Sequence, residues 1–382
     1  MVDSVVEGLR GRSIAEWQLA ARANNFNLVR LSLASFVIWS HSAWLLNGRV
    51  ERDEMSDLLG HTLATLAVDG FFFVSGFLVS QSLFRRHGLL RFAAMRVTRI
   101  WPGLAVSLIV TVLAFALASG RPLAYLIDGE TLRFLAWNLA QVRAYYLLPA
   151  LVAGDAPLLV NGSLWTITWE LRCYVGLALF YGIAGAARKR VLTMATLAGL
   201  AVCTGWSVAR EVLPVLPDLS RGLGYNLAVG LRLGGCFSAG IAAALWWRHI
   251  VILPALAVSL WLAAFVEHAA TGTGLLAPVA MFYSTLVVAF VQRNARAATA
   301  DWYDLSYGIY IYAWPVMLLI HLAAPEVPRP ALALATLIGC LPLATLSWLL
   351  VERPALEAAK RWVRPGSRDT AATTAGLPEP PV

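Results

Sequence analysis

Two ionisable residues lie on one apolar stretch of this sequence, and their spacing indicates chemistry inside a membrane. Arg30 and His41 belong to the run from Asn27 to Leu46, which is otherwise apolar enough to enter a bilayer. A helix turns about 100° per residue, so this spacing puts both on nearly the same face, about 16 Å apart along the axis. Ionisable groups inside a membrane usually face a protein interior, so His41 is our first candidate catalytic residue. The alternative is a hydrogen bond from His41 to a neighbouring helix.

Two carboxylates, Asp69 and Glu170, are expected at a similar depth to His41. Each lies near the outer start of an apolar stretch, the second and the fourth in chain order. A carboxylate can fix the tautomer of an imidazole and stabilise its charged form, so the three residues could form an acid–base site. A buried ion-pair network that holds helices together is the structural alternative.

Other polar residues could bind substrate or a phosphate. Ser75 precedes Gly76, but the Gly-x-Ser-x-Gly motif of a nucleophilic serine is absent, so we expect Ser75 to donate to a neighbour or to substrate and Gly76 to allow close helix packing. Arg96 and Arg99 have helical spacing at the start of the third stretch, which suits bidentate phosphate recognition, although arginines in an inner-face loop also simply fix topology.

The ninth apolar stretch is dense in aromatic residues and could line a cavity. It contains Tyr307, Tyr310 and Trp314, followed by Pro315, which would kink a helix. The sequence has no Walker loop, no dinucleotide fingerprint and no His-Glu-x-x-His motif, and its four cysteines are scattered singly. We therefore predict no metal site and no nucleotide-driven step.

Composition and the length of the apolar stretches indicate an all-α, polytopic membrane helix bundle. The chain has 382 residues, of which 59% are hydrophobic and 14% charged. Stretches of about 20 apolar residues can span a bilayer as helices. We predict about ten such helices, at 28–46, 64–84, 99–119, 164–185, 191–209, 226–247, 250–267, 275–292, 304–324 and 331–351.

Charges between these stretches predict the orientation of the chain. The even-numbered loops are basic, so the positive-inside rule puts both termini in the cytoplasm, and the net charge of +8 needs no nucleic acid to explain it. The N-terminal residues lack the pattern of a cleaved signal peptide. Residues 132–152 are interrupted by polar side chains, and we interpret them as an amphipathic element on the outer face. Three regions result: a cytoplasmic segment at 1–27, a transmembrane domain at 28–352, and a basic stretch with a disordered tail at 353–382.

Six motifs in order resemble the acyltransferase type 3 family of bacterial membrane enzymes. They are Arg-x10-His at Arg30 and His41, Asp-x-Phe-Phe-x-x-Ser-Gly-Phe at Asp69 to Phe77, Arg-x-x-Arg at Arg96 and Arg99, Leu-Trp-Thr-x-x-x-Glu at Leu164 to Glu170, Ser-Tyr-x-x-Tyr at Ser306 to Tyr310, and Glu-Arg-Pro at Glu352 to Pro354. This resemblance implies an enzyme of the bacterial inner membrane that transfers an acyl group, commonly acetyl, onto a surface or exported carbohydrate.

The resemblance also implies roles for the candidate residues. Acyl-CoA would be the co-substrate, its phosphates meeting Arg30, Arg96 and Arg99. His41 would act as general base or carry the acyl group transiently, with Glu170 or Asp69 orienting it. The substrate-binding candidates are Ser75, Trp165, Tyr307, Tyr310 and Trp314.

One departure from the family concerns position 313. Relatives often have a histidine where this chain has Ala313, which cannot make an imidazole's hydrogen bonds, so acceptor choice could differ. The sequence leaves open a succinyl or other acyl group, a non-sugar acceptor, a lipid-linked acceptor, and a proton-coupled transporter whose three ionisable residues relay protons.

Overall fold

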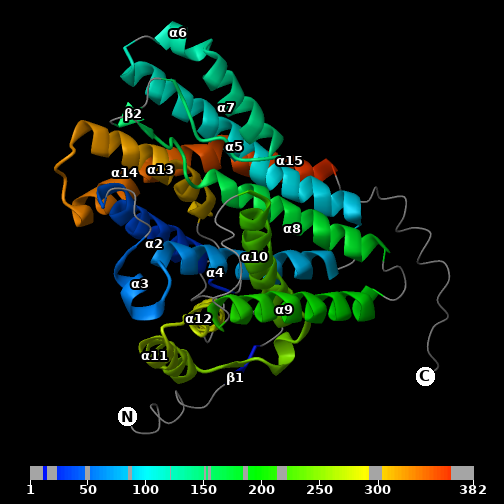
Figure 1. Ribbon diagram of the computed structural model, residues 1–382. Helices are drawn as coiled ribbons and strands as arrows, with labels where there is room; N and C mark the ends of the chain where they lie inside the picture. The colour runs from blue at the N-terminus through cyan, green and yellow to red at the C-terminus, as the bar shows by residue number, and fades with distance from the viewer. Residues whose placement is uncertain are drawn as a thin grey trace, which may run out of the picture.

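The computed structural model describes residues 12–14, 24–47, 52–84, 88–120, 122–149, 152–153, 156–183, 188–212, 222–291 and 303–362, and it is mostly helical (Figure 1). Its first helices are α2 (Phe26–Leu46), α3 (Glu54–Leu59), α4 (Leu63–Phe84), α5 (Leu89–Ala118), α6 (Pro122–Leu126), α7 (Gly129–Ala140) and α8 (Leu164–Ile183). They are followed by α9 (Arg188–Val212), α10 (Gly222–Leu245), η3 (Trp247–His249), α11 (Pro254–Thr271), α12 (Ala277–Phe290), α13 (Ser306–Ala323), α14 (Arg329–Ser347), η5 (Trp348–Glu352) and α15 (Arg353–Trp362).

The strands in the described part of the chain are two residues long and form two antiparallel pairs. β1 (Arg12–Ser13) pairs with β4 (Val251–Ile252), and β2 (Val152–Ala153) pairs with β3 (Ala156–Pro157). These ladders tie loops together and add no layer to the helical architecture.

A helix occurs at each of the ten predicted positions, and seven helical segments of the described chain are long and apolar enough to cross a membrane. They are Phe26–Leu46, Leu63–Leu83, Leu89–Ala118, Asn226–Leu245, Pro254–Thr271, Ser306–Ala323 and Arg329–Trp362. The protein is therefore a multi-pass membrane protein, and the total of ten spans stays a prediction. The predicted orientation rests partly on loop arginines such as Arg85 and Arg293, which lie outside the described residues. The tail from residue 363 also lies outside them.

Glycine allows α4 and α10 to pack with their backbones in contact. A methyl group at Gly76 would lie 2.1 Å from the carbonyl oxygen of Phe237, and one at Gly240 would lie 2.0 Å from that of Phe73. Neither backbone can give way to such a group, so both positions require glycine. Small residues at helix contacts are typical of membrane bundles, and the expectation of close packing at Gly76 is confirmed.

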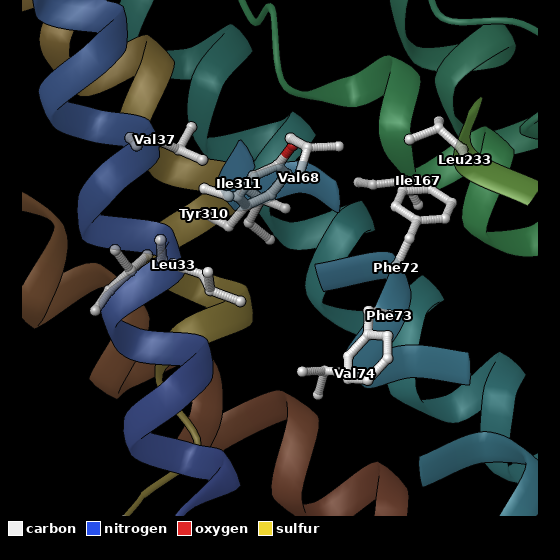
Figure 2. Packing of buried hydrophobic residues seen from close by; sticks show 14 of the residues in the cluster. Leu33, Val37, Val68, Phe72, Phe73, Val74, Ile167, Leu233, Tyr310 and Ile311 are labelled. Atoms are coloured by element: carbon white, nitrogen blue, oxygen red, sulfur yellow. The ribbon is translucent and has the colours of Figure 1, made fainter. Parts of the chain in front are cut away.

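The core lies where α2, α4, α8, α10 and α13 meet. Figure 2 shows Leu33 of α2 near Tyr310 of α13, while Phe72 of α4 points toward Ile167 of α8 and Leu233 of α10. Leu33 and Leu233 are among the fully buried side chains of the cluster. Because α2 packs against both α4 and α13, the helix with Arg30 and His41 is held on two sides.

The segment between α5 and α8 folds back along α5, and the outer-face position predicted for residues 132–152 stays a prediction. α7 lies beside α5 (Figure 1), and the indole N–H of Trp101 donates to the carbonyl oxygen of Leu139 over 3.0 Å. At about 1.5 Å per residue, Trp101 lies about 26 Å from Ala118, the last residue of α5. α7 therefore runs antiparallel along the C-terminal part of α5.

Buried amides build the tip of the hairpin that α7 forms with the residues after it. The side chain of Asn138 donates to the carbonyl oxygen of Tyr145 over 2.8 Å and accepts from its backbone N–H over 3.0 Å. Gln141 has a left-handed backbone, and its side chain accepts a bond from Thr168 of α8 at 3.2 Å. These bonds satisfy polar groups of a buried turn that has no helical hydrogen bonds of its own.

Candidate active site

The two ends of α2 have different surroundings, and the Arg30 end is built from ion pairs. Arg30 forms an ion pair with Asp304 at 3.0 Å, and Arg99 of α5 contacts the same carboxylate oxygen at 2.8 Å. The hydroxyl of Ser306 donates to the other oxygen of Asp304 at 2.8 Å. One carboxylate just before α13 therefore joins two arginines from two other helices.

A second carboxylate, Glu352, completes this network from the end of the α14 helix. It lies in the π-helical turn η5, is 1% exposed, and accepts a hydrogen bond from Ser347 at 2.9 Å. Arg99 approaches it at 3.5 Å and also lies over the rings of Tyr307 and Trp348, with 5.5 and 5.8 Å to the centroids. π-helical turns often occur at functional sites because they aim one side chain differently.

Glu170 lies next to this network. Its carboxylate accepts a hydrogen bond from Ser75 at 2.7 Å and another from the hydroxyl of Tyr174. The guanidinium of Arg96 lies 5.7 Å from the centroid of the Tyr174 ring, and its buried Nε–H has no hydrogen-bond partner among the described residues. Glu170 also acts electrostatically on Arg30, which places it in the same region of the bundle.

Asp69 is separate from Glu170, although both were expected at one depth with His41. Its carboxylate forms an ion pair with Arg232 of α10 at 2.8 Å. Ser75, the partner of Glu170, is six residues further along α4 than Asp69, which is about 9 Å along the axis. Asp69 and Glu170 therefore lie in different layers, and no contact among the described residues joins either of them to His41.

The His41 end is aromatic. The imidazole meets the ring of Trp314 edge-on, with 4.7 Å between centroids, and Trp44 contacts the same indole at 4.9 Å. We find no hydrogen bond to the imidazole within the described part of the chain. Asp53 acts on it electrostatically, but that carboxylate already accepts bonds from Ser40 at 2.5 Å and from the first residue of α4 at 2.8 Å. The two ring nitrogens of His41 are thus available to a substrate.

The aromatic candidates divide between the two ends. Tyr307 donates to the carbonyl oxygen of Ile100 at 2.9 Å and belongs with Arg99. Trp314 donates to the carbonyl oxygen of Leu159 at 2.8 Å beside His41.

The remaining candidates on these helices lie between the two ends. The hydroxyls of Tyr310 and Thr166 are 2.8 Å apart. Trp165 is half-buried against the core, and Ala313 is buried.

Four charged residues of the site were not assigned roles from the sequence. In the sequence, Asp304 is only the first residue of a predicted span, and Glu352 is only part of a motif. Asp53 is one of several acidic residues in a loop. Arg232 is a single charge in an apolar helix, and that is the signal by which it could have been found. Within the described residues no group of three or more histidines, cysteines and carboxylates could hold a metal ion.

The geometry fits acyl transfer better than proton relay. An imidazole with free nitrogens can remove the proton of an attacking hydroxyl, which is general-base catalysis. A relay would need His41, Asp69 and Glu170 in contact or joined by polar groups, and they lie in separate clusters. Arg30 and Arg96 each keep a buried, unpartnered Nε–H that an anion or carbonyl group could accept.

Comparisons with known proteins show the family of the chain. A family profile described as an acyltransferase domain matches residues 24–352. The chain is 28% identical to nodulation protein 10 of Rhizobium leguminosarum bv. viciae, covering 87% of this chain and 93% of that protein. It is 25% identical to the O-acetyl transferase of Shigella phage Sf6, covering 87% and 96%. No solved structure matches significantly. The chain belongs to the acyltransferase type 3 family and is an O-acyltransferase.

Proposed function

We propose that this protein transfers an acetyl group from acyl-CoA to a hydroxyl of a surface or exported carbohydrate, in the inner membrane of a bacterium. The observation that carries the proposal is the imidazole of His41, which has no hydrogen bond among the described residues in a chain of an acyltransferase family. The name of the phage relative, an O-acetyl transferase, favours acetyl over succinyl.

The donor would approach from the Arg30 end of α2, which the predicted topology puts on the cytoplasmic side. Arg30, Arg96 and Arg99 are the proposed contacts of its phosphates. Arg30 and Arg99 already share Asp304, so a phosphate would have to compete with that carboxylate for them. Arg96 has no carboxylate partner among the described residues and is the arginine of the three that is best placed to bind a phosphate first.

His41 then acts about 16 Å further along α2. We propose that it removes the proton of the acceptor hydroxyl as that oxygen attacks the thioester carbonyl, and the thiol of coenzyme A leaves with a proton. Trp314, Trp44, Trp165 and Tyr310 would form the apolar and hydroxyl surface on which a sugar ring lies. Ser75 and Glu170 would lie on the path of the donor's arm, because Glu170 is close to Arg30.

Mass spectrometry of glycans tests this function. Surface and exported glycans are compared between cells that carry the chain and cells that lack it. We expect a mass increment of an acetyl group only in cells that carry the chain. A succinyl increment would instead identify succinyl-CoA as the donor. The absence of an increment from every glycan fraction would overturn the proposal of a carbohydrate acceptor. Purified protein with labelled acetyl-CoA or succinyl-CoA then identifies the donor directly.

A further inference from the structure

Two exposed arginines at the tip of the hairpin after α7 lack a carboxylate partner among the described residues. Arg143 follows the end of α7 and lies over the ring of Trp137, with 4.6 Å to the centroid. Arg172 of α8 lies over the ring of Trp169, with 4.3 Å to the centroid. Cation–π contacts hold both guanidiniums in place without neutralising their charge.

Seven arginines of the described chain differ from this pair, because a carboxylate balances their charge. This holds for Arg30, Arg52, Arg99, Arg133, Arg232, Arg329 and Arg353. The nearest such pair in the sequence is Arg133 with Glu130 on α7. Glu130 also accepts a hydrogen bond from Tyr145, so its charge is already engaged. Arg143 and Arg172 therefore leave two positive charges uncompensated.

The two guanidiniums belong to one small surface. Arg172 donates to the carbonyl oxygen of Val142 at 3.1 Å, and Val142 directly precedes Arg143. The tip is fixed to α8 a turn earlier, where Thr168 donates to Gln141 at 3.2 Å. The arginine of the hairpin and the arginine of α8 are thus held on the same side of the bundle by hydrogen bonds.

Apolar side chains surround this charged surface. Val142 is 59% exposed, and Val175 and Leu179 of α8 are 57% and 59% exposed. Val175 and Leu179 follow Arg172 at intervals of three and seven residues, so they lie on the same face of the helix. An uncompensated guanidinium beside surface that faces hydrocarbon is costly unless an anion approaches it.

We propose that Arg143 and Arg172 bind the phosphate group of an anionic membrane lipid, whose hydrocarbon chain lies along Val175 and Leu179. A guanidinium binds phosphate oxygens through two parallel N–H donors, and two guanidiniums can bind one phosphate from two sides. The apolar flank favours a lipid phosphate over a soluble one, because a soluble phosphate has nothing to bury there. This site does not depend on the proposed transferase chemistry.

Lipid binding to the purified protein tests the proposal. The delipidated, full-length protein in neutral detergent is titrated with phosphatidylglycerol, and bound lipid is counted by native mass spectrometry. We expect the Arg143→Gln and Arg172→Gln variants each to bind this lipid roughly tenfold more weakly, because each loses charge-assisted hydrogen bonds. The matched control is Arg133→Gln, which removes the same charge from α7 at a residue that has a carboxylate partner, and it should bind as the unchanged protein does.

Two further arms distinguish the sources of phosphate. Inorganic phosphate and coenzyme A are added as competitors at equal concentration, and neither should displace the lipid. Displacement by coenzyme A would assign the surface to the donor and overturn the lipid, and unchanged lipid binding by the double variant would overturn the site. If a glutamine variant fails to fold, Arg172→Lys replaces it: it keeps the charge but loses the paired donors, so its binding should still be weaker.

Discussion

The two ends of helix α2 show how one membrane helix can carry both a rigid clamp and a reactive group. At the Arg30 end, four segments of the chain contribute charges that neutralise one another, since Arg30 and Arg99 share Asp304 and Arg99 also approaches Glu352. At the other end, His41 meets the edge of Trp314 and finds no hydrogen bond among the described residues. Paired charges fix geometry, whereas an unpaired imidazole keeps its nitrogens for chemistry.

The contrast follows from the cost of burying polar groups. An arginine in an apolar bundle is stable only with a partner, and removing that partner is more harmful than never having had the pair. A neutral imidazole costs less to leave unpaired, and a substrate hydroxyl can supply its missing bond. The Arg30 end should therefore respond to mutation through stability, and the His41 end through activity.

The largest effect is expected at His41. His41→Ala should lower the rate of acyl transfer by about 10² to 10⁴-fold, because a positioned general base is lost. The amount of protein in the membrane should stay the same, since the imidazole makes no hydrogen bond in the described structure. Initial rates with labelled acyl-CoA, normalised to membrane protein, measure this.

Ser35→Ala on the same helix is the control for His41. Its hydroxyl donates only to the carbonyl oxygen of Leu31 at 3.0 Å, one turn away, so its loss should leave both rate and protein level unchanged. If the His41→Ala protein keeps more than a tenth of the activity, His41 is not the general base, and the proposed difference between the two ends of α2 is wrong.

The next effect is expected at Asp304. Asp304→Asn should lower the free energy of unfolding by about 3 to 5 kcal/mol, because Arg30 and Arg99 would be left without their shared carboxylate. Thermal unfolding of the protein in detergent measures this. Asp57→Asn is the control, since its ion pair with Arg52 is more than half exposed and should contribute about 0 to 1 kcal/mol. Equal melting temperatures for the two variants would show that the Arg30 end is not a clamp.

A smaller effect is expected at Trp314. Trp314→Phe removes the N–H that donates to Leu159, and this should lower the free energy of unfolding by about 1 kcal/mol. Because the indole also touches His41, the rate of acyl transfer should fall at the same time. Trp44→Phe contacts the same cluster without a hydrogen bond among the described residues, so it should change the rate less. If neither variant changes the rate of acyl transfer, Trp44 and Trp314 have no role in catalysis.

The smallest effect is expected at the rim of the His41 end, where Arg329 binds Glu54 of α3. The hydrogen bond from Arg329 lowers the pKa of Glu54 below its ordinary value of about 4.5. The ionised form is therefore favoured in the folded protein, so the stabilisation is complete above that ordinary value and is lost as the pH falls through the lowered pKa. Glu54 is more than half exposed, which limits the contribution to about 0 to 1 kcal/mol.

Melting temperatures between pH 3 and pH 7 test this rim contact. The unchanged protein should lose a small increment of stability below about pH 4.5, and Glu54→Gln should lack that increment while melting almost alike at low pH. A larger loss in the variant at pH 3 than at pH 7 would contradict the sign of the shift.

Much of the helical architecture could be predicted from the sequence, because long apolar stretches have one stable backbone form in a bilayer. Each of the ten predicted ranges contains a helix. At 132–152 the sequence could not show how its polar residues are satisfied. Asn138 and Gln141 interrupt the apolar pattern, and only the folded chain shows that they bond within the tip and to α8.

The sequence by itself determined the membrane setting, the helix that carries Arg30 and His41, and the motifs that resemble the acyltransferase family. The period of a helix and the apolar length of a span are local properties, which a sequence displays directly. Only the tertiary structure decided which charges meet. Asp304, which is distant in sequence, forms an ion pair with Arg30, and Arg232 forms one with Asp69. Glu170 accepts hydrogen bonds from Ser75 and Tyr174 and does not contact His41. Such contacts depend on how the helices pack.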